Sequence, residues 1–480
     1  MILSLVALVA STAAQPRIER VDCARFAQVD PVAKVECGYL RVAEDRDVPS
    51  SRIIGVPFAI VHNAHRTSDD PLVMIAGGPG GRVIPRRIRP VSPEFGGRDV
   101  VFFEQRGTDL ADPRLDCPGY AEEKQKAQLG RIDGRELARG LIEVARRCVA
   151  DAGRKGIRLS GYTSRAIVGD LEDFRRLQGY SRINLVGVSY GGKVIFEYAR
   201  DHPDHTRAVV ANTPLTLEAN YDEQGQSAMR RTLDLIIAGC EREPACDDAH
   251  PRLARKFRDI VERAASKPWL LDIPDSDRAG GTRHVRATPW VVVNALLDQF
   301  YSPDTFELVP ARIDAIWAGN RKALSDILDI GKSTYPWLMR LSLWCNEEVP
   351  FEDPARVAAD LSGYPEFARV DQATVPNGLC KAAGVVSHPA ATENQPVRSD
   401  VPFLIFSGLF DPATPPTIQR SAARSLTHAT LVLFPSAGHG AGFSACGGRL
   451  IGAFIADPAA SLDAACANDP PAPHFTRSLK

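Results

Sequence analysis

The sequence predicts an α/β fold with a mostly parallel sheet flanked by helices and one helical segment inserted between its two parts. Up to about residue 215, short apolar runs alternate with stretches of helical period, which is the pattern of parallel strands joined by helices. From about residue 221 to 387 the chain reads mainly as helices separated by prolines. Strand-like runs then return at Val401–Gly408 and Thr430–Phe434.

Five apolar runs, each too short for a helix of ordinary length, are the expected strands of the first part. They are Ile53–Val61, Leu72–Ala76, Arg98–Phe103, Ile183–Val188 and Ala208–Ala211. Helical spacing is found at 134–148 and at 163–179. In the second of these stretches, Ile167, Leu171, Phe174 and Leu177 are expected to share one face, and Gly179 ends the helix.

The change in character along the chain predicts its domain organisation. We expect a signal-peptide-like segment at 1–15, a first core part at 16–215, a helical cap at 216–395, a second core part at 396–467 and a poorly ordered tail at 468–480. The expected cap helices are Met229–Gly239, Leu253–Ser266, Trp290–Phe300 and Phe306–Ile316. An insertion of this kind usually lies over the carboxyl ends of the strands, where ligands bind.

Charge and composition limit the classes of partner. The chain of 480 residues has 58 basic and 59 acidic side chains, with 44% apolar residues. Without a basic excess it has little to release counterions from phosphates, so we expect no nucleic-acid partner. No later apolar run is long enough to span a bilayer, so we expect no integral membrane segment in the mature chain.

The start of the chain and its cysteines favour export. Ile2–Ala10 is almost wholly apolar and is followed by small residues, which is typical of a secretory signal without its positive start. A buried N-terminal strand is the alternative. The ten cysteines fall into near pairs and form no C-x-x-C motif, which favours disulfides in an oxidising compartment over a zinc site. The hypothetical pairs are Cys23/Cys37, Cys117/Cys148, Cys240/Cys246, Cys345/Cys380 and Cys446/Cys466.

The strand Ile183–Val188 runs directly into Gly-Val-Ser-Tyr-Gly, and a helix follows. A Gly-x-Ser-x-Gly match in this context indicates a tight turn that lifts Ser189 to the carboxyl edge of the sheet. Side chains at Gly187 and Gly191 would collide with the neighbouring strand and helix. A glycine-rich turn with an incidental serine is the alternative.

Two further loops follow expected strands. Gly77–Gly81 reads Gly-Gly-Pro-Gly-Gly, and its free backbone N–H groups suit a developing oxyanion, although a plain turn is also compatible. It lacks the Lys and Ser/Thr of a phosphate-binding loop. The charged stretch Glu104–Asp109 is expected to form a buried ion-pair knot that holds loops near the site, rather than to be catalytic.

Ser189, Asp411 and His439 each lie just past a strand, in the chain order expected of an α/β-hydrolase triad. In such a triad the histidine takes the serine proton, and the aspartate holds the imidazole tautomer. Asp400 and Asp457 are rival acids, but each sits at the wrong end of its element.

Together these segments resemble the prolyl aminopeptidase and tripeptidyl aminopeptidase family of serine peptidases. The resemblance rests on Gly77–Gly81, on Gln-Arg-Gly at 105–107, on Gly-Val-Ser-Tyr-Gly-Gly at 187–192, on Asp411 and on the Gly438–His439 pair. The stretch Leu343–Phe351 is similar to the exported tripeptidyl aminopeptidase-like branch. The chain departs from the family at Ala76, where histidine is common, and at Glu104, where aspartate is common.

The resemblance implies an exopeptidase that releases short N-terminal pieces through an acyl-enzyme on Ser189. It implies an oxyanion hole from the N–H groups of Gly78 and Tyr190, and a grip on the free α-amino group by Glu347 and Glu348. An ordinary solvated acidic turn is the alternative for these two residues. No metal or organic cofactor is implied.

Two other functions remain compatible with these residues. The same triad serves an esterase or amidase of small molecules, because esters and amides share a tetrahedral intermediate. A binding protein on this scaffold without catalytic activity is the second alternative, although binding alone would not require an intact triad. The expected partner is a peptide with a free N-terminus, and the sequence does not determine the oligomeric state.

Overall fold

The computed structural model describes residues 15–48, 50–275, 277–278, 280–331, 335–363, 378–385, 389–390, 392–475 and 478–479. All but the last residue of the expected signal-like segment therefore lies outside the described residues. No helix in these ranges is both long and apolar enough to cross a lipid bilayer.

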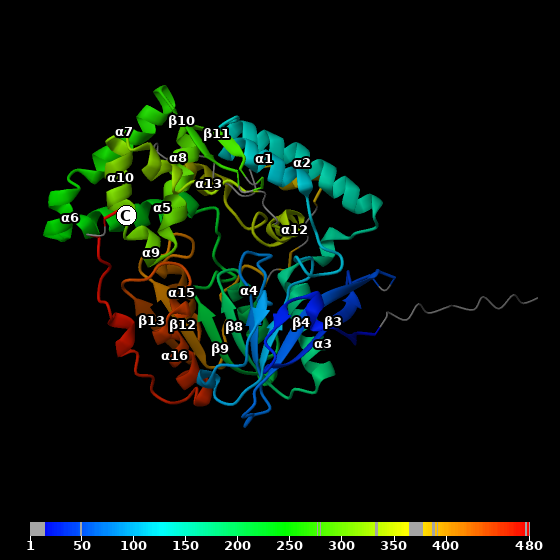
Figure 1. Cartoon of the computed structure of the whole chain (residues 1–480). Coiled ribbons are helices and arrows are strands. Elements are labelled where there is room, and N and C mark those ends of the chain that lie inside the picture. Colours follow the sequence, from blue (N-terminus) through cyan, green and yellow to red (C-terminus); the bar gives the residue numbers. More distant parts are fainter. Residues whose placement is uncertain are drawn as a thin grey trace, which may run out of the picture.

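The centre of the molecule is a nine-stranded sheet, counted over the described residues, in the order β1-β3-β4-β7-β5-β8-β9-β12-β13 (Figure 1). The pairs from β7 to β13 are parallel, and β1, β3, β4 and β7 pair antiparallel at the other edge. This confirms the mostly parallel sheet. The strands are β1 Arg17–Val21, β3 Lys34–Ala43, β4 Ile53–His62, β5 Leu72–Ile75, β7 Val100–Phe103, β8 Ile183–Val188, β9 Thr206–Asn212, β12 Phe403–Gly408 and β13 Ala429–Phe434.

Helices cover both faces of this sheet. Alternate strand residues point to opposite faces, so Leu185 and Val209 join one apolar cluster with α3, α4 and α15, while Val186 and Val210 join another with α16. These helices are α3 Ser164–Gln178, α4 Gly191–Asp201, α15 Pro416–Ser425 and α16 Ala445–Ala456. The helix expected at 163–179 is thus α3, begun by the Thr163 side chain and ended by Gly179 at φ 73°.

A second layer lies over the carboxyl ends of the parallel strands (Figure 1). Its helices are α5 Gly225–Arg242, α6 Pro244–Ala249, α7 Leu253–Ser266, α8 Pro289–Leu297, α9 Pro303–Phe306, α10 Val309–Trp317, α11 Arg321–Ser325, α12 Trp337–Glu347, α13 Pro354–Ser362 and α14 Leu379–Ala383. We call this layer, formed by the described residues between 216 and 395, the cap.

The cap holds two features that the sequence pattern did not indicate. A hairpin of β10 Trp269–Pro274 and β11 Thr282–Ala287 lies among its helices. Two helices from before the nucleophile strand, α1 Pro118–Gln128 and α2 Gly134–Arg154, also pack beside the cap elements α8, α12 and α14 (Figure 1). A short parallel pair, β2 Gln28–Val29 with β6 Arg87–Ile88, lies outside the main sheet.

The proline-rich end of the chain was expected to be poorly ordered, but its described part packs on the cap. Phe475 is 2% exposed and contacts the rings of Phe306 and Phe410. Its backbone N–H donates to Glu243 Oε2 at 2.8 Å. The docking is explained by the burial of the Phe475 ring, because removing a large apolar surface from water stabilises the packed end of the chain even where prolines are frequent.

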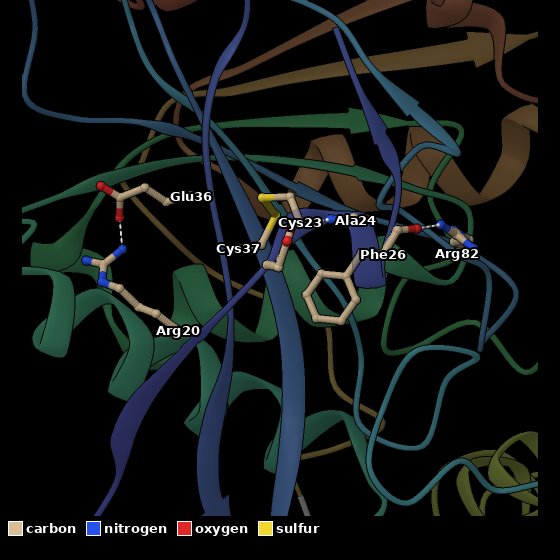
Figure 2. Close-up of a disulfide and its surroundings, with 8 residues drawn as sticks. Arg20, Cys23, Ala24, Phe26, Glu36, Cys37 and Arg82 are labelled. Carbon is tan, nitrogen blue, oxygen red and sulfur yellow. Dashed lines mark hydrogen bonds and ion pairs between the residues drawn. A yellow bond between two sulfur atoms is a disulfide. The ribbon is translucent and has the colours of Figure 1, made fainter. Parts of the chain in front are cut away.

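All five hypothetical cysteine pairs are confirmed as disulfides. Each closes a short stretch of chain: Cys345–Cys380 joins α12 to α14 inside the cap, and Cys446–Cys466 anchors α16. Figure 2 shows Cys23–Cys37 at the antiparallel edge of the sheet, with Phe26 beside it and the Arg20–Glu36 ion pair nearby. A hollow of about 970 Å³ surrounds this disulfide and contains none of the predicted site residues.

The charged stretch after β7 forms the expected buried knot. Arg106 is 0% exposed and donates to both oxygens of Asp170, at 2.8 and 2.6 Å, and to the carbonyls of Glu44 and Gly161. Glu104 is also buried, and it accepts from the N–H groups of two residues that follow the glycine-rich loop. Burial raises the pKa of Glu104 to about 7. The knot joins the Arg106 segment to α3 through Asp170, and to the segments of Glu44 and Gly161 through their carbonyls.

Candidate active site

Ser189 lies in the tight turn between β8 and α4 with φ 54°, a left-handed conformation that is strained for a serine. A side chain at Gly187 would come within 2.8 Å of Ile195 and of the Gly191 carbonyl, and one at Gly191 within 2.8 Å of the Ala76 carbonyl. These clashes with the following helix and with a neighbouring strand segment are the ones predicted from the sequence. The turn therefore requires both glycines and presents a partly exposed serine at the sheet edge.

Asp411 and His439 meet at the same edge. His439 Nδ1 lies 2.9 Å from Asp411 Oδ2, and Asp411 also accepts from the Ala413 and Thr414 N–H groups and the Thr414 hydroxyl, each at 2.8 Å. Asp411 is fully buried. Burial lowers the pKa of His439, but the charge of Asp411 and the hydrogen bond outweigh it and raise that pKa above 6.5. The rival acids Asp400 and Asp457 line a separate hollow with Thr206, at the start of β9.

The end of β9 connects the serine turn to the histidine loop. The Asn212 carbonyl accepts from the Ser189 N–H at 3.1 Å, and the Asn212 side chain accepts from the Gly442 N–H at 2.9 Å. Thr213 Oγ1 accepts from the Gly440 N–H at 2.9 Å. One dipeptide thus holds loops that are about 250 residues apart in the sequence, and no sequence motif marks it.

The glycine-rich loop lies against the serine turn. A Cβ at Gly77 would come within 2.8 Å of Ser189 Cβ, so only glycine fits there. Gln105 braces the loop, because its side chain donates to the Ala76 carbonyl at 2.7 Å and accepts from the Gly80 N–H at 3.2 Å. Neither the Gly78 nor the Tyr190 N–H donates to another atom in the part of the chain that the structure describes. Both amides are therefore available to an oxyanion.

Cap residues reach these loops from above. The Tyr301 carbonyl accepts from the His439 N–H at 2.9 Å, and the two rings meet edge-on with centroids 5.7 Å apart. The Tyr335 hydroxyl donates to the Pro79 carbonyl, and Arg340 Nη1 donates to the Gly78 carbonyl. None of these three residues was predicted from the sequence, since a single side chain that turns inward from a helix or loop leaves no pattern in the sequence.

A pocket of about 710 Å³ lies between the cap and the helices α1 and α2. Its wall includes Tyr301, whose ring contacts that of His439, but Ser189, Asp411 and His439 do not line it. Its lining mixes aromatic and apolar side chains, such as Tyr120, Met229 and Trp290, with polar ones, such as Asp298 and Gln299. The volume lies in the usual range of small-ligand sites.

Glu347 and Glu348 lie at the end of α12, 4% and 2% exposed, and both have partners within the chain. Glu347 accepts from the Ser164 N–H and from Ser164 Oγ, the latter at 2.6 Å. Glu348 forms an ion pair with the buried Lys193 of α4. Burial raises the pKa of both glutamates, that of Glu347 to about 8. Their role in binding an α-amino group stays a prediction.

The fold and the site geometry define the class of protein. Residues 70–445 match the family described as alpha/beta hydrolase fold, and the chain belongs to this family.

Two relatives are peptidases by name, and one of these names specifies a serine protease. The chain is 28% identical over 223 residues to tripeptidyl aminopeptidase of Streptomyces coelicolor, covering 43% of this chain and 40% of the relative. It is 21% identical over 420 residues to serine protease Hip1 of Mycobacterium tuberculosis, covering 79% of this chain and 76% of the relative. The chain thus spans about two fifths of the Streptomyces protein. These matches confirm the resemblance found in the motifs and support a hydrolase.

Among solved structures, the chain is similar to proline iminopeptidase of Mycobacterium smegmatis at 13% identity and a TM-score of 0.36, covering 84% of this chain and 95% of that one. It is also similar to MGS-M2, an alpha/beta hydrolase from a deep-sea metagenome, at 14% identity and a TM-score of 0.36, covering 85% and 96%.

Proposed function

We propose that this protein is a serine exopeptidase that releases short N-terminal pieces from peptides through an acyl-enzyme. The observation that carries the proposal is the hydrogen-bonded pair of His439 and Asp411, joined through the end of β9 to the strained turn of Ser189. The pocket beneath the cap has room for a short peptide, and its wall includes Tyr301, whose ring contacts that of His439.

In the proposed reaction, Ser189 Oγ attacks the scissile carbonyl while His439 takes its proton. Asp411 keeps the imidazole oriented and stabilises the imidazolium. The N–H groups of Gly78 and Tyr190 donate to the oxygen that becomes negative in the tetrahedral intermediate. His439 then protonates the leaving amine, and water hydrolyses the acyl-enzyme by the same steps in reverse order.

Negative charge for a free α-amino group is present in the pocket. Asp298 and Asp329 line it and are exposed, whereas Glu347 and Glu348 are committed to Ser164 and Lys193. A free α-amino group would be attracted to these carboxylates and an acetylated N-terminus would not, so we expect a preference for free N-termini.

Five disulfides support an exported protein, because they persist in oxidising compartments. We therefore place the proposed activity outside the cytosol, in the secreted or periplasmic space, with peptides as the substrate.

The test is hydrolysis of aminoacyl and tripeptidyl amides with free and with acetylated N-termini. The proposal expects the free substrates to have a kcat/KM at least about tenfold higher, since a lost charge contact is worth roughly 1.5–3 kcal/mol. Equal rates on the free and acetylated substrates would contradict the exopeptidase.

An esterase or amidase of small molecules is the second candidate. The engagement of Glu347 and Glu348 inside the chain favours it, because it removes the amine ligands expected from the sequence. Turnover of p-nitrophenyl esters together with no turnover of any free peptide amide would decide for this candidate.

A further inference from the structure

Helix α12 of the cap reaches both candidate oxyanion donors with two side chains of one helical face. Arg340 and Glu347 are seven residues apart, which is two turns and therefore the same side of the helix. Arg340 is 8% exposed and Glu347 is 4% exposed. Their contacts lie at two different places beneath the cap. Arg340 contacts the glycine-rich loop, and Glu347 contacts the N-terminal end of α3.

At the Arg340 end, the guanidinium donates from Nη1 to the Gly78 carbonyl and lies over the Trp344 ring, 4.0 Å from its centroid. Gly78 has φ 119°, so its backbone direction is set by its surroundings and not by ordinary preference. Because the carbonyl and the N–H of Gly78 belong to adjoining peptide planes, a fixed carbonyl limits the direction of the N–H.

At the Glu347 end, the carboxyl group holds Ser164 by two hydrogen bonds, from its N–H and from its Oγ. Ser164 Oγ lies 2.6 Å from the Tyr190 hydroxyl. When Ser164 donates to Glu347, the Tyr190 hydroxyl donates to Ser164, and the ring of Tyr190 is fixed at 2% exposure. Tyr190 is the residue directly after the nucleophile, and its N–H is the second candidate donor.

We propose that α12 sets the geometry of the oxyanion hole, with Arg340 fixing Gly78 and Glu347 fixing Tyr190 through Ser164. Both are positioning residues, because neither contacts the reacting atoms. The inference rests on the proposed function only in requiring an oxyanion on the Ser189 adduct, and it holds for esters and peptides alike. It gives Glu347 a role different from the amine grip that the family resemblance implies.

The test compares Glu347→Ala, Glu347→Gln and Arg340→Met with the wild type on p-nitrophenyl butyrate. For Glu347→Ala and Arg340→Met we expect kcat to fall about 10- to 100-fold with KM changed less than about threefold, since a misdirected donor costs transition-state stabilisation. Affinity for an alkyl trifluoromethyl ketone, which forms an oxyanion adduct with the serine, should fall by a similar factor. Glu347→Gln should retain most of the wild-type kcat and of the ketone affinity, because the amide oxygen of the glutamine still accepts a hydrogen bond from Ser164.

Ser342→Ala is the matched control on the same helix. Ser342 is fully buried, and its hydroxyl hydrogen-bonds the Leu159 carbonyl at 2.6 Å and the Tyr162 carbonyl at 3.2 Å. Among the described residues it forms no hydrogen bond with Gly78, Ser164 or Tyr190. It should lower the melting temperature and leave kcat and ketone affinity unchanged. If Glu347→Ala does not fold, Tyr190→Phe replaces it in the test, because it removes only the hydroxyl that contacts Ser164. For Tyr190→Phe we expect a fall of about three- to tenfold in kcat and in ketone affinity.

Equal changes in kcat and ketone affinity for Glu347→Ala and Ser342→Ala would overturn the inference, as would a Tyr190→Phe enzyme with unchanged values of both. A wild type that cleaves the ester but no free peptide would refute the proposed exopeptidase and leave this inference standing.

Discussion

The sheet and the cap contribute to the candidate site in different ways. Ser189, Asp411 and His439 all follow strands of the sheet within a few residues, so the hydrogen-bonded strands fix where each one lies. Cap residues such as Arg340 and Glu347 contact the neighbouring glycine-rich loop and Ser164 of α3 through side chains on a helix. The sheet thus places the groups that would react, and the cap holds the segments that surround them.

This difference separates two kinds of substitution. A change at a strand end removes a reacting group, and triad members act as a unit, so the loss of rate should be large. A change in the cap leaves the reacting groups in place and alters their surroundings, so its effect should be graded.

Ser189→Ala should abolish labelling by a fluorophosphonate and lower kcat by about 10⁵- to 10⁶-fold, because no other group takes over the nucleophile's role. Gel fluorescence after labelling, with esterase rates on the same samples, measures both. Persistent labelling of the variant would show that another serine reacts.

Asp411→Asn should lower kcat by roughly 10³- to 10⁴-fold with the fold intact, because the amide favours the wrong imidazole tautomer and carries no charge. Asp457→Asn is the matched control, since Asp457 lies in the hollow by the start of β9. Steady-state kinetics check the pair, and equal losses in the two variants would contradict the assignment of the acid.

Arg106→Met should destabilise the core by about 3 kcal/mol while kcat per folded molecule stays near the wild-type value. The substitution leaves the buried Asp170 with Arg46 as its remaining ion-pair partner. It also removes the Arg106 hydrogen bonds to the carbonyls of Glu44 and Gly161. Urea denaturation measures the free energy of unfolding. Lys126→Met, which removes an exposed pair with Glu123, should cost less than about 1 kcal/mol.

The raised pKa of His439 fixes the sign of two pH effects. Below that pKa, kcat/KM should rise about tenfold per pH unit, because only the neutral imidazole accepts a proton. For stability the sign is opposite: the protonated histidine contributes fully below about pH 6.5 and the contribution is lost as pH rises through the folded-state pKa. An inflection in kcat/KM below pH 6 would contradict the Asp411 contact.

Tyr335→Phe should have the smallest effect, a fall of about fivefold or less in kcat with unchanged fluorophosphonate labelling at saturation. It removes one hydrogen bond from the cap to the Pro79 carbonyl, and Arg340 still holds the loop. Ester kinetics measure it. A loss as large as that of Asp411→Asn would mean that the cap does more than position the loop.

Much of the fold was predictable because its signals are local. The strands β4, β5, β8 and β13 begin and end within a residue or two of the predicted runs. Each of the five disulfides joins two cysteines that are consecutive among the cysteines of the chain. Strand β3 was not predicted, although it is ten residues long, because polar residues interrupt its apolar run. The hairpin β10–β11 was not predicted for a similar reason. Alternate residues of both strands are exposed, so neither strand forms a continuous apolar run.

The turn at Ser189 and its two glycines can be read from local residue types, because a tight backbone turn admits few of them. The order of serine, aspartate and histidine along the chain can be read in the same way. The positions of α1 and α2 beside the cap, the docking of Phe475, and the contacts of Arg340 with Gly78 and of Glu347 with Ser164 follow from long-range packing. These contacts join residues far apart in the chain through side chains that have many possible partners. Chain connectivity and packing select one partner among them, and no local pattern records that choice.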